Sequence, residues 1–277
     1  MSAGIRREWV EQMVGEYSLS LRRACRIVSV SRTVARYQVR PRDDGDVVSA
    51  LHELAVEHPR WGFGKMFPRL RLLGHPWNHK RVYRVYCAMK LNLRIQRRKR
   101  LPKRFPEALA QPSLPNHCWS MDFMSDALLS GRRFRTLNII DDFNRQVLAI
   151  EVDFSLPAGR VLRVLDRLAE WHGYPKLIRC DNGPEFISNA LMTWAQTHHV
   201  VLDFIRPGQP SQNAYIERFN RTYREEVLDS FVFRSLQEVR HITHEWMNSY
   251  NQQRPHDALH GLTPAGFRLA AGFALHF

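Results

Sequence analysis

The sequence predicts an α/β protein with a mixed sheet and flanking helices, preceded by an all-α, basic N-terminal region. Two observations predict the sheet: three strand-like segments follow one another from residue 117, and later strands alternate with helical segments. Successive strands predict an antiparallel meander, whereas alternation predicts parallel βαβ units with helices on the faces. The third observation, an uneven charge, sets the N-terminal region apart.

Positive charge is concentrated in the first 112 of the 277 residues, which carry 24 Lys and Arg against 9 Asp and Glu. The remaining residues carry 17 against 18, and the whole chain has a net charge of +14. This distribution indicates a polyanionic partner, with nucleic acid as the leading candidate. An anionic membrane surface and a merely solvated basic face are the alternatives.

Composition argues against several other classes of protein. Hydrophobic residues make up 44% of the chain, so we expect a packed core. No apolar run approaches the roughly 20 residues that span a bilayer, and the first residues lack the apolar segment of a signal peptide. The four cysteines have no paired spacing, which argues against disulfides and a Cys-rich zinc site. We therefore expect a cytoplasmic protein.

Residues 1–42 predict a helix-turn-helix-like segment. Residues 5–17 have the pattern of one helix, and residues 18–38 have the pattern of two more helices, the second capped by Ser31. Two packed helices that do not contact DNA remain the alternative.

Residues 47–93 predict a second helical, helix-turn-helix-like region, in which Asn78 can cap a helix. The basic, proline-broken residues 94–115 predict a linker, either lying along phosphate groups or acting as a solvated tether.

Residues 116–252 contain the predicted sheet, and residues 253–277 form a C-terminal tail. The pattern predicts strands and helices in the order βββαβαβα followed by a last helix: strands 117–129, 134–143 and 146–155, helix 158–173, strand 176–181, helix 185–198, strand 200–205, helix 214–228 and helix 235–250.

Two of these helices have a clear apolar face. In the helix at 158–173 the expected buried face is Val161, Val164, Leu165, Leu168 and Trp171. In the helix at 214–228 it is Ile216, Phe219, Tyr223 and Val227, and we expect Asn213 to cap this helix.

Three carboxylates fall where an open α/β sheet builds sites. Asp122 lies in a strand that this topology tends to make central, Asp181 ends the fourth strand, and Glu217 lies on the helix after the fifth. Three acids brought together need cations, and oxygen ligands suit Mg²⁺ or Mn²⁺. Two such ions could activate a hydroxyl and stabilise the leaving oxygen of a phosphodiester. Taken singly, Asp181 could be a turn residue and Glu217 a solvent-facing one.

Other acids are weaker candidates for metal binding. Asp126 is about 13 Å along the strand from Asp122, the pair Asp141 and Asp142 is expected to serve a turn, and Glu185 is expected to start a helix. Glu225 and Glu226 are further rivals.

The spacing and the surrounding motifs carry a family resemblance. Thirty-five residues separate Asp181 from Glu217, and the motifs are WSMDF (119–123), CDNGPEF (180–186), PGQPSQNAYIERFNRTYREE (207–226) and YNQQRPHDALHGLTPAGF (250–267). Over roughly residues 50–270 the chain resembles bacterial insertion-sequence transposases of the second-reading-frame (OrfB) type, DDE enzymes with a retroviral-integrase-like core.

The resemblance implies an RNase H-like five-stranded sheet with Asp122, Asp181 and Glu217 as the metal-binding catalytic triad. It implies two Mg²⁺ or Mn²⁺ ions, cleavage of DNA at the element ends, and transfer of the freed 3′-hydroxyl to another phosphodiester. It also implies a homo-oligomer on DNA, a partner or fusion from the upstream frame (OrfA), and a nucleoid-associated location. A nuclease without strand transfer and a catalytically silent DNA-binding protein are the alternatives.

Basic residues near these segments are the candidates for contacting DNA. Arg221 follows Glu217 by one helical turn, and Arg224 matches the basic residue that the family carries seven positions after its Glu. The others are Lys80, Arg81, Arg97, Arg98, Lys99 and Arg100. The sequence departs from the family at Ser29, where relatives commonly carry Gly, and at Pro68 inside a predicted helix.

Overall fold

The computed structural model describes residues 2–37, 43–94, 109, 111–206 and 210–274. The chain divides into two compact units, Met1–Asp46 and Val47–Phe277. In the described ranges, no helix has both the length and the apolar character that crossing a membrane requires.

The first unit contains three short helices that pack around Val10, Ala24 and Cys25. They are α1 (Ala3–Gly15), α2 (Leu21–Ile27) and α3 (Arg32–Ala35). The side chain of Ser31 accepts a hydrogen bond from the Val34 amide at 3.2 Å, so the predicted cap is confirmed. Ser29, in the turn between α2 and α3, has φ = 55°, a left-handed conformation that glycine adopts more readily.

The second unit begins with a helical module whose core includes Leu51, Trp61, Met66 and Val82. Its helices are α4 (Gly45–Glu57), α5 (Phe63–Leu72) and α6 (His79–Ala88). The Asn78 side chain accepts a hydrogen bond from the Lys80 amide at 2.8 Å, which confirms the second predicted cap. Pro68 lies inside α5.

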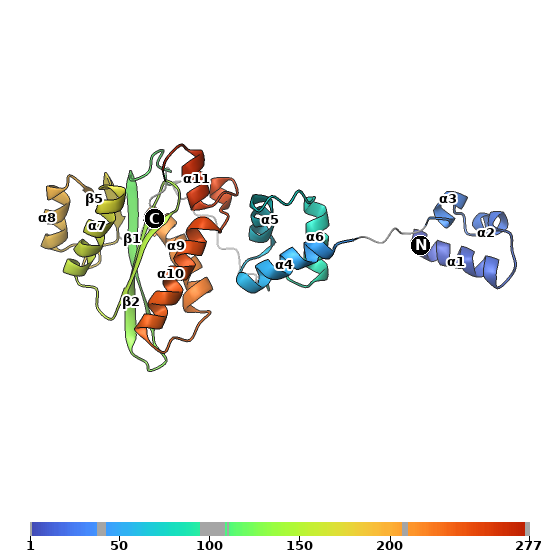
Figure 1. Cartoon of the computed structure of the whole chain (residues 1–277), viewed down its shortest axis with the longest axis horizontal. Coiled ribbons are helices and arrows are strands. Elements are labelled where there is room, and N and C mark those ends of the chain that lie inside the picture. The colour runs from blue at the N-terminus through green and yellow to red at the C-terminus, as the bar shows by residue number, and fades with distance from the viewer. Residues whose placement is uncertain (1, 38–42, 95–108, 110, 207–209, 275–277) are drawn as a thin grey trace. The chain divides into compact units, whose positions relative to one another are not determined.

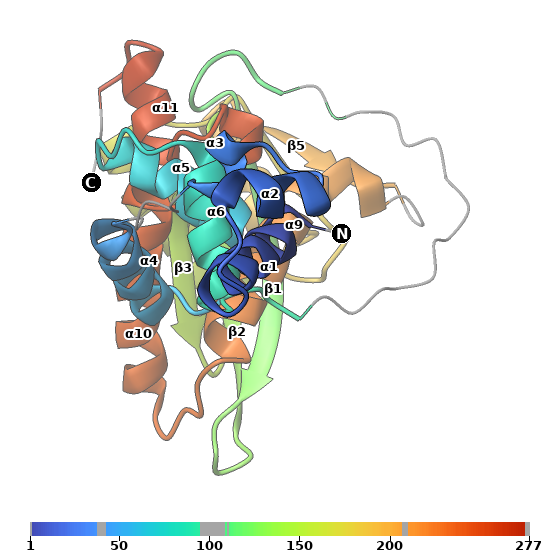
Figure 2. The same ribbon diagram turned by 90° about the vertical axis from the view of Figure 1, so that its right-hand side faces the viewer.

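A five-stranded mixed sheet follows, as the sequence predicts, and its strand order is β3-β2-β1-β4-β5. The strands are β1 (Cys118–Ala127), β2 (Arg133–Asp141), β3 (Val147–Asp153), β4 (Leu177–Cys180) and β5 (Val201–Phe204). The first three form an antiparallel meander, and β4 and β5 add in parallel to the other edge of β1. The β1–β2 hairpin turn projects beyond the helices at one end of the sheet (Figures 1 and 2).

Helices cover both faces of the sheet, with α7 and α8 on one side and α9 and α10 on the other (Figure 1). Their bounds are α7 (Ala158–His172), α8 (Asn189–Thr197), α9 (Ala214–Tyr223) and α10 (Leu236–Gln252). Side chains alternate along β1, so Trp119 and Met121 pack in the core with α7 and α8. The expected face of α9, including Ile216 and Tyr223, packs in the core on the other side.

Shorter elements complete the second unit. A 3₁₀ turn, η1 (Pro210–Asn213), precedes α9, and a π-helical turn, η2 (Arg224–Leu228), continues it. A second 3₁₀ turn, η3 (Asp257–Leu259), and α11 (Pro264–Ala270) follow α10.

Three sequence expectations are wrong in detail. Helix α8 begins after its cap Ser188 and not at Glu185, because the Glu185 carboxylate instead pairs with Arg135 of β2. Trp171, in the last turn of α7, is 62% exposed and does not belong to the buried face. Asn213 makes no side-chain cap to α9, and its buried Oδ1 has no partner among the described residues.

Candidate active site

Asp122 lies in the interior of the central strand β1, opposite Asn138 of β2. Its Oδ1 accepts a hydrogen bond from the Phe123 amide at 2.8 Å, and its Oδ2 accepts one from Nδ2 of Asn220 at 2.7 Å. Asn220, on α9, accepts in turn from Nδ2 of Asn138 at 2.7 Å. The three side chains therefore link β2, α9 and β1, which holds the α9 helix at a fixed place over Asp122.

Asp181 follows directly after β4, the strand parallel to β1, so it lies at the carboxyl end of that strand. Its Oδ1 accepts a hydrogen bond from the Gly183 amide at 3.0 Å. A Cβ atom added to Gly183 would also lie 3.0 Å from Oδ1, closer than real Cβ atoms normally come. A larger residue at position 183 would therefore push the Asp181 carboxylate away from its present place.

Glu217 lies in the first turn of α9 and is exposed. Partial burial raises the pKa of its carboxyl, and the charge of Arg221 opposes that rise. Arg221 therefore lies close enough to Glu217 to act on it, as the spacing of one helical turn predicts.

The negative charges of Asp181 and Glu217 both act on Asp122. Burial, together with the negative charges of Asp181 and Glu217, raises the pKa of Asp122 from 3.8 to about 6, against the hydrogen bonds from Phe123 and Asn220. Burial, followed by the charges of Asp181, Asp203 and Asp122, raises the pKa of the Cys180 thiol to about 12. The site thus concentrates negative charge that a cation would relieve.

The donor chemistry of these acids fits a hard divalent cation, since all three offer carboxylate oxygens. Among the described residues, however, no three His, Cys, Asp or Glu side chains form a group that could hold one metal ion. Two ions, each bound by two of the three acids, would need only pairs of these side chains.

Arg224, a predicted DNA contact, makes an ion pair in this structure. Its Nη1 lies 3.1 Å from Oδ2 of Asp126 and 3.6 Å from Oδ1 of Asp229, and its Nη2 donates to the Ser125 carbonyl at 3.0 Å. Asp126, a rival metal ligand, is therefore held by a guanidinium at the far end of β1.

The other rival acids also have partners. Asp141 accepts hydrogen bonds from the amides of Phe143 and Asn116, which confirms its expected place in a turn. Asp142 is fully buried and pairs with Arg179 at 3.0 Å. Glu226 pairs with Arg254, and Glu225 is exposed on η2.

The remaining predicted DNA contacts lie away from the acids in the sequence. Lys80 is exposed and Arg81 half-buried in the first turn of α6. Arg97, Arg98, Lys99 and Arg100 lie outside the described residues.

Sequence reasoning missed Asn220. It is 8% exposed and stands beside the apolar stripe of α9. A polar side chain at such a position must find a buried partner. The position of Asn220 beside the apolar stripe could therefore have indicated a structural role, but it could not identify Asp122 as the partner.

Comparisons with known proteins agree with the geometry. Two Integrase core domain profiles match residues 112–210 and 198–264, and an HTH-like domain profile matches residues 41–100. The chain is 43% identical, over 90% of its length and 91% of the relative's, to the insertion element IS407 uncharacterized 31.7 kDa protein of Burkholderia multivorans. The chain belongs to the insertion-sequence transposases of the OrfB type.

Two further similarities are more distant. The putative transposase InsK for insertion sequence element IS150 of Escherichia coli is 23% identical over 88% of this chain and 91% of its own. The HTLV-2 integrase catalytic core domain in complex with magnesium (trimeric form) aligns with a TM-score of 0.44 at 18% identity, over 55% of this chain and 95% of that chain. The integrase core of this transposase contains the five-stranded mixed sheet, and an HTH-like helical region precedes it.

Proposed function

We propose that this protein cleaves DNA at the ends of its insertion sequence and joins the freed ends to target DNA. Asp122, Asp181 and Glu217 are the catalytic residues of the proposal. The observation that carries it is at Asp122, a half-buried carboxyl on the central strand whose pKa is raised by burial and by the negative charges of Asp181 and Glu217.

The reaction has two steps that balance without a covalent protein intermediate. In the first, water attacks a backbone phosphorus atom, the P–O bond to the 3′-oxygen breaks, and a 3′-hydroxyl leaves. In the second, that hydroxyl attacks another phosphodiester, and the displaced 3′-oxygen of the target leaves with a proton. The number of phosphodiester bonds is unchanged in the second step, so no nucleotide cofactor is needed.

Divalent cations, Mg²⁺ or Mn²⁺, would be held by the three acids in pairs and would lower the barrier by stabilising the attacking and leaving oxygens. The protein's own contribution is positional. Asn220 fixes the Oδ2 side of Asp122, the Gly183 amide fixes Asp181, and Arg221 beside Glu217 offers a cation for the DNA backbone.

Glu217→Gln tests the proposal on labelled duplexes that carry the element's own ends, with Mg²⁺ and the upstream-frame polypeptide present. The variant should bind these duplexes like the wild type and lose both nicking and joining. Glu225→Gln is the matched control, because it makes the same change at an exposed glutamate on η2, and it should keep both activities.

Each other outcome points to a different protein. Normal nicking by Glu217→Gln would show that the triad is misassigned. Nicking without joining by the wild type would identify a nuclease, and binding without any chemistry would identify a silent DNA-binding protein.

The proposal includes the partners that the family implies. The HTH-like region would contact the element ends, the upstream-frame product would join the complex, and several copies of the chain would assemble on DNA in the cytoplasm. Mixing the two polypeptides with the end duplex and measuring the mass of the complex tests this assembly.

A further inference from the structure

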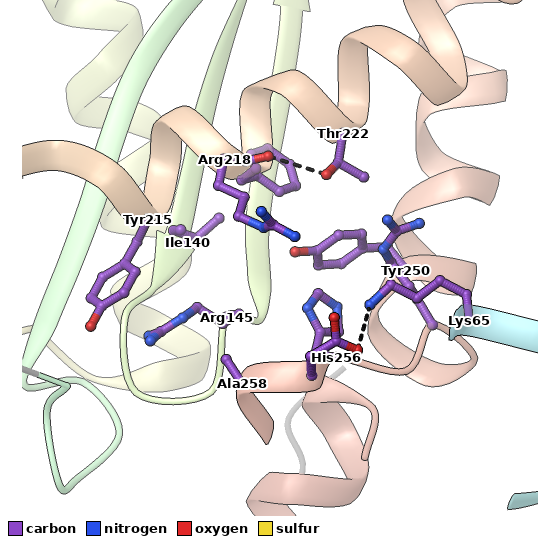
Figure 3. A pocket seen from close by; sticks show the side chains of 12 residues that line it. Lys65, Ile140, Arg145, Tyr215, Arg218, Thr222, Tyr250, His256 and Ala258 are labelled. Atoms are coloured by element: carbon purple, nitrogen blue, oxygen red, sulfur yellow. Dashed lines mark hydrogen bonds and ion pairs between the residues drawn. The ribbon is translucent and has the colours of Figure 1, made fainter. Parts of the chain in front are cut away.

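A cavity of about 320 Å³ lies beside α9, within the second unit. Arg218 and Thr222 of α9, Arg145 of the β2–β3 turn, His256 after α10 and Lys65 of α5 are arranged around it (Figure 3). Its walls thus come from four segments that are far apart in the sequence.

Cationic side chains dominate the lining: Lys65, Arg145, Arg218 and Arg254. Two of them are paired with acids, Lys65 with the exposed Asp257 at 3.3 Å and Arg254 with Glu226. Arg145 and Arg218 form no ion pair with a carboxylate in the part of the chain that the structure describes. The lining therefore carries four cations against one acid, Asp257, and the charge of Arg145 also acts on the buried Asp142 behind it.

Arg145 is the most unusual member of this lining. It is 9% exposed, and its guanidinium stacks on the Tyr215 ring with the central carbon 3.5 Å from the ring centroid. Its Nη1 is buried and has no hydrogen-bond partner among the described residues. A buried donor without an acceptor costs free energy, so Arg145 brings an unsatisfied cationic group to the wall of the cavity.

His256 lies in the same field of positive charge. Burial, followed by the charges of Arg254, Lys65, Arg145 and Arg218, lowers the pKa of its imidazole to about 2. All four cations of the lining therefore act on one half-buried ring. The ring is neutral at physiological pH, and its Nε2 is a second buried polar atom without a described partner.

We propose that this pocket binds a phosphate group, and that in the working complex it is a backbone phosphate of DNA. Guanidinium groups present planar forks of donors that match phosphate oxygens. The DNA source rests on the proposed function and on position, because Arg218 directly follows Glu217 on α9. The pocket would anchor the duplex on the flank of α9 that faces away from the acids.

Arg218→Gln is the variant that tests the pocket, because Arg218 is exposed and its side chain makes no described ion pair, so the fold should tolerate the change. Binding of the full chain to a short labelled duplex of arbitrary sequence is measured by anisotropy from about 50 to 200 mM salt. Loss of one phosphate contact should reduce the slope of log affinity against log salt by about 0.9.

Arg163→Gln is the matched control. Arg163 is an exposed arginine on α7, on the other face of the sheet, and it also makes no described ion pair, so the variant removes the same charge and should leave the salt slope unchanged. A second arm replaces single phosphates of the duplex by neutral methylphosphonates. One position should weaken binding by the wild type and have no effect on binding by Arg218→Gln.

Inorganic phosphate separates the two sources of the ligand. If phosphate raises the melting temperature of the wild type but not of Arg218→Gln, while both proteins show the same salt slope with DNA, the pocket binds free phosphate and the DNA assignment is overturned. Equal slopes with no effect of phosphate overturn the pocket itself. If Arg218→Gln reduces the salt slope but the wild type never cleaves DNA, the proposed function is refuted and the phosphate-binding pocket is supported.

Discussion

Replacing Asp122 by asparagine should stabilise the metal-free protein at about pH 8. The native pKa of about 6 lies about 2 units above the value of 3.8 for a free carboxyl. At 1.36 kcal/mol per unit, ionised Asp122 destabilises the fold by about 3 kcal/mol. Asparagine has one acceptor oxygen where aspartate uses two, for the Phe123 amide and for Asn220. Losing one of these hydrogen bonds costs about 1 kcal/mol, which leaves a net gain of about 2 kcal/mol.

The gain should depend on pH in a defined direction. Because the carboxyl binds its proton more tightly in the folded state, the wild type loses this stability as pH rises from about 4 through about 6. Below that window Asp122 is protonated in both states, and the variant should then be the less stable protein by the lost hydrogen bond.

Urea unfolding in EDTA at about pH 8 and pH 4 measures both effects. Asp126→Asn is the control on the same strand, and because Asp126 is paired with Arg224 it should lose stability rather than gain it. A variant Asp122→Asn that is less stable than the wild type at pH 8, or equally stabilised at pH 4, would refute the argument. Adding Mg²⁺ should stabilise the wild type by ligand linkage and the variant much less.

Three further predictions concern other parts of the chain. Ser29→Gly should stabilise the N-terminal unit by about 1 kcal/mol, measured by hydrogen exchange in α1–α3, because Ser29 has φ = 55°; unchanged protection would contradict this. Arg254→Met should lower the free energy of unfolding by about 3–5 kcal/mol, because Glu226 would remain buried without its guanidinium, and adding Glu226→Gln should restore part of it in the same urea assay. Cys87 should react first with a thiol reagent at about pH 8, because it is half-buried while the other three cysteines are buried. The pKa of Cys180 is also raised to about 12, which slows its reaction. Equal reaction rates for all four thiols would contradict the fold.

The mixed sheet and the direction of its strands could be predicted because each strand has its own local pattern. The meander needs only consecutive strands, and the helices between later strands dictate parallel pairing. The candidate acids followed from this topology and from the family's spacing. The structure adds that Asp122 is coupled to Asp181 and Glu217 by charge.

The errors come from contacts that no local pattern contains. Glu185 stands after a proline, where a helix start is a reasonable expectation, yet Arg135 of β2 takes its carboxylate. Trp171 follows the spacing of the α7 stripe, but it falls in the last turn and remains exposed. The basic pocket could not be predicted from the sequence for the same reason, because only the tertiary fold brings Lys65, Arg145 and Arg218 together.

Helix α9 explains how acid and base can be neighbours in sequence and still serve different surfaces. Successive residues turn by about 100° around a helix, so Glu217 and Arg218 leave the buried stripe of Ile216 on different flanks. On one flank Glu217 acts on Asp122, and on the other Arg218 lines the basic pocket with Thr222, one turn further on. A DNA strand crossing the exposed ridge of α9 would meet the acids on one side and the guanidinium on the other. A chain with both Glu217→Arg and Arg218→Glu should therefore lose DNA cleavage and the phosphate contact of the basic pocket, while Ile216 and the core remain intact. If this chain binds DNA with the wild-type salt slope, the two flanks of α9 do not have these separate roles.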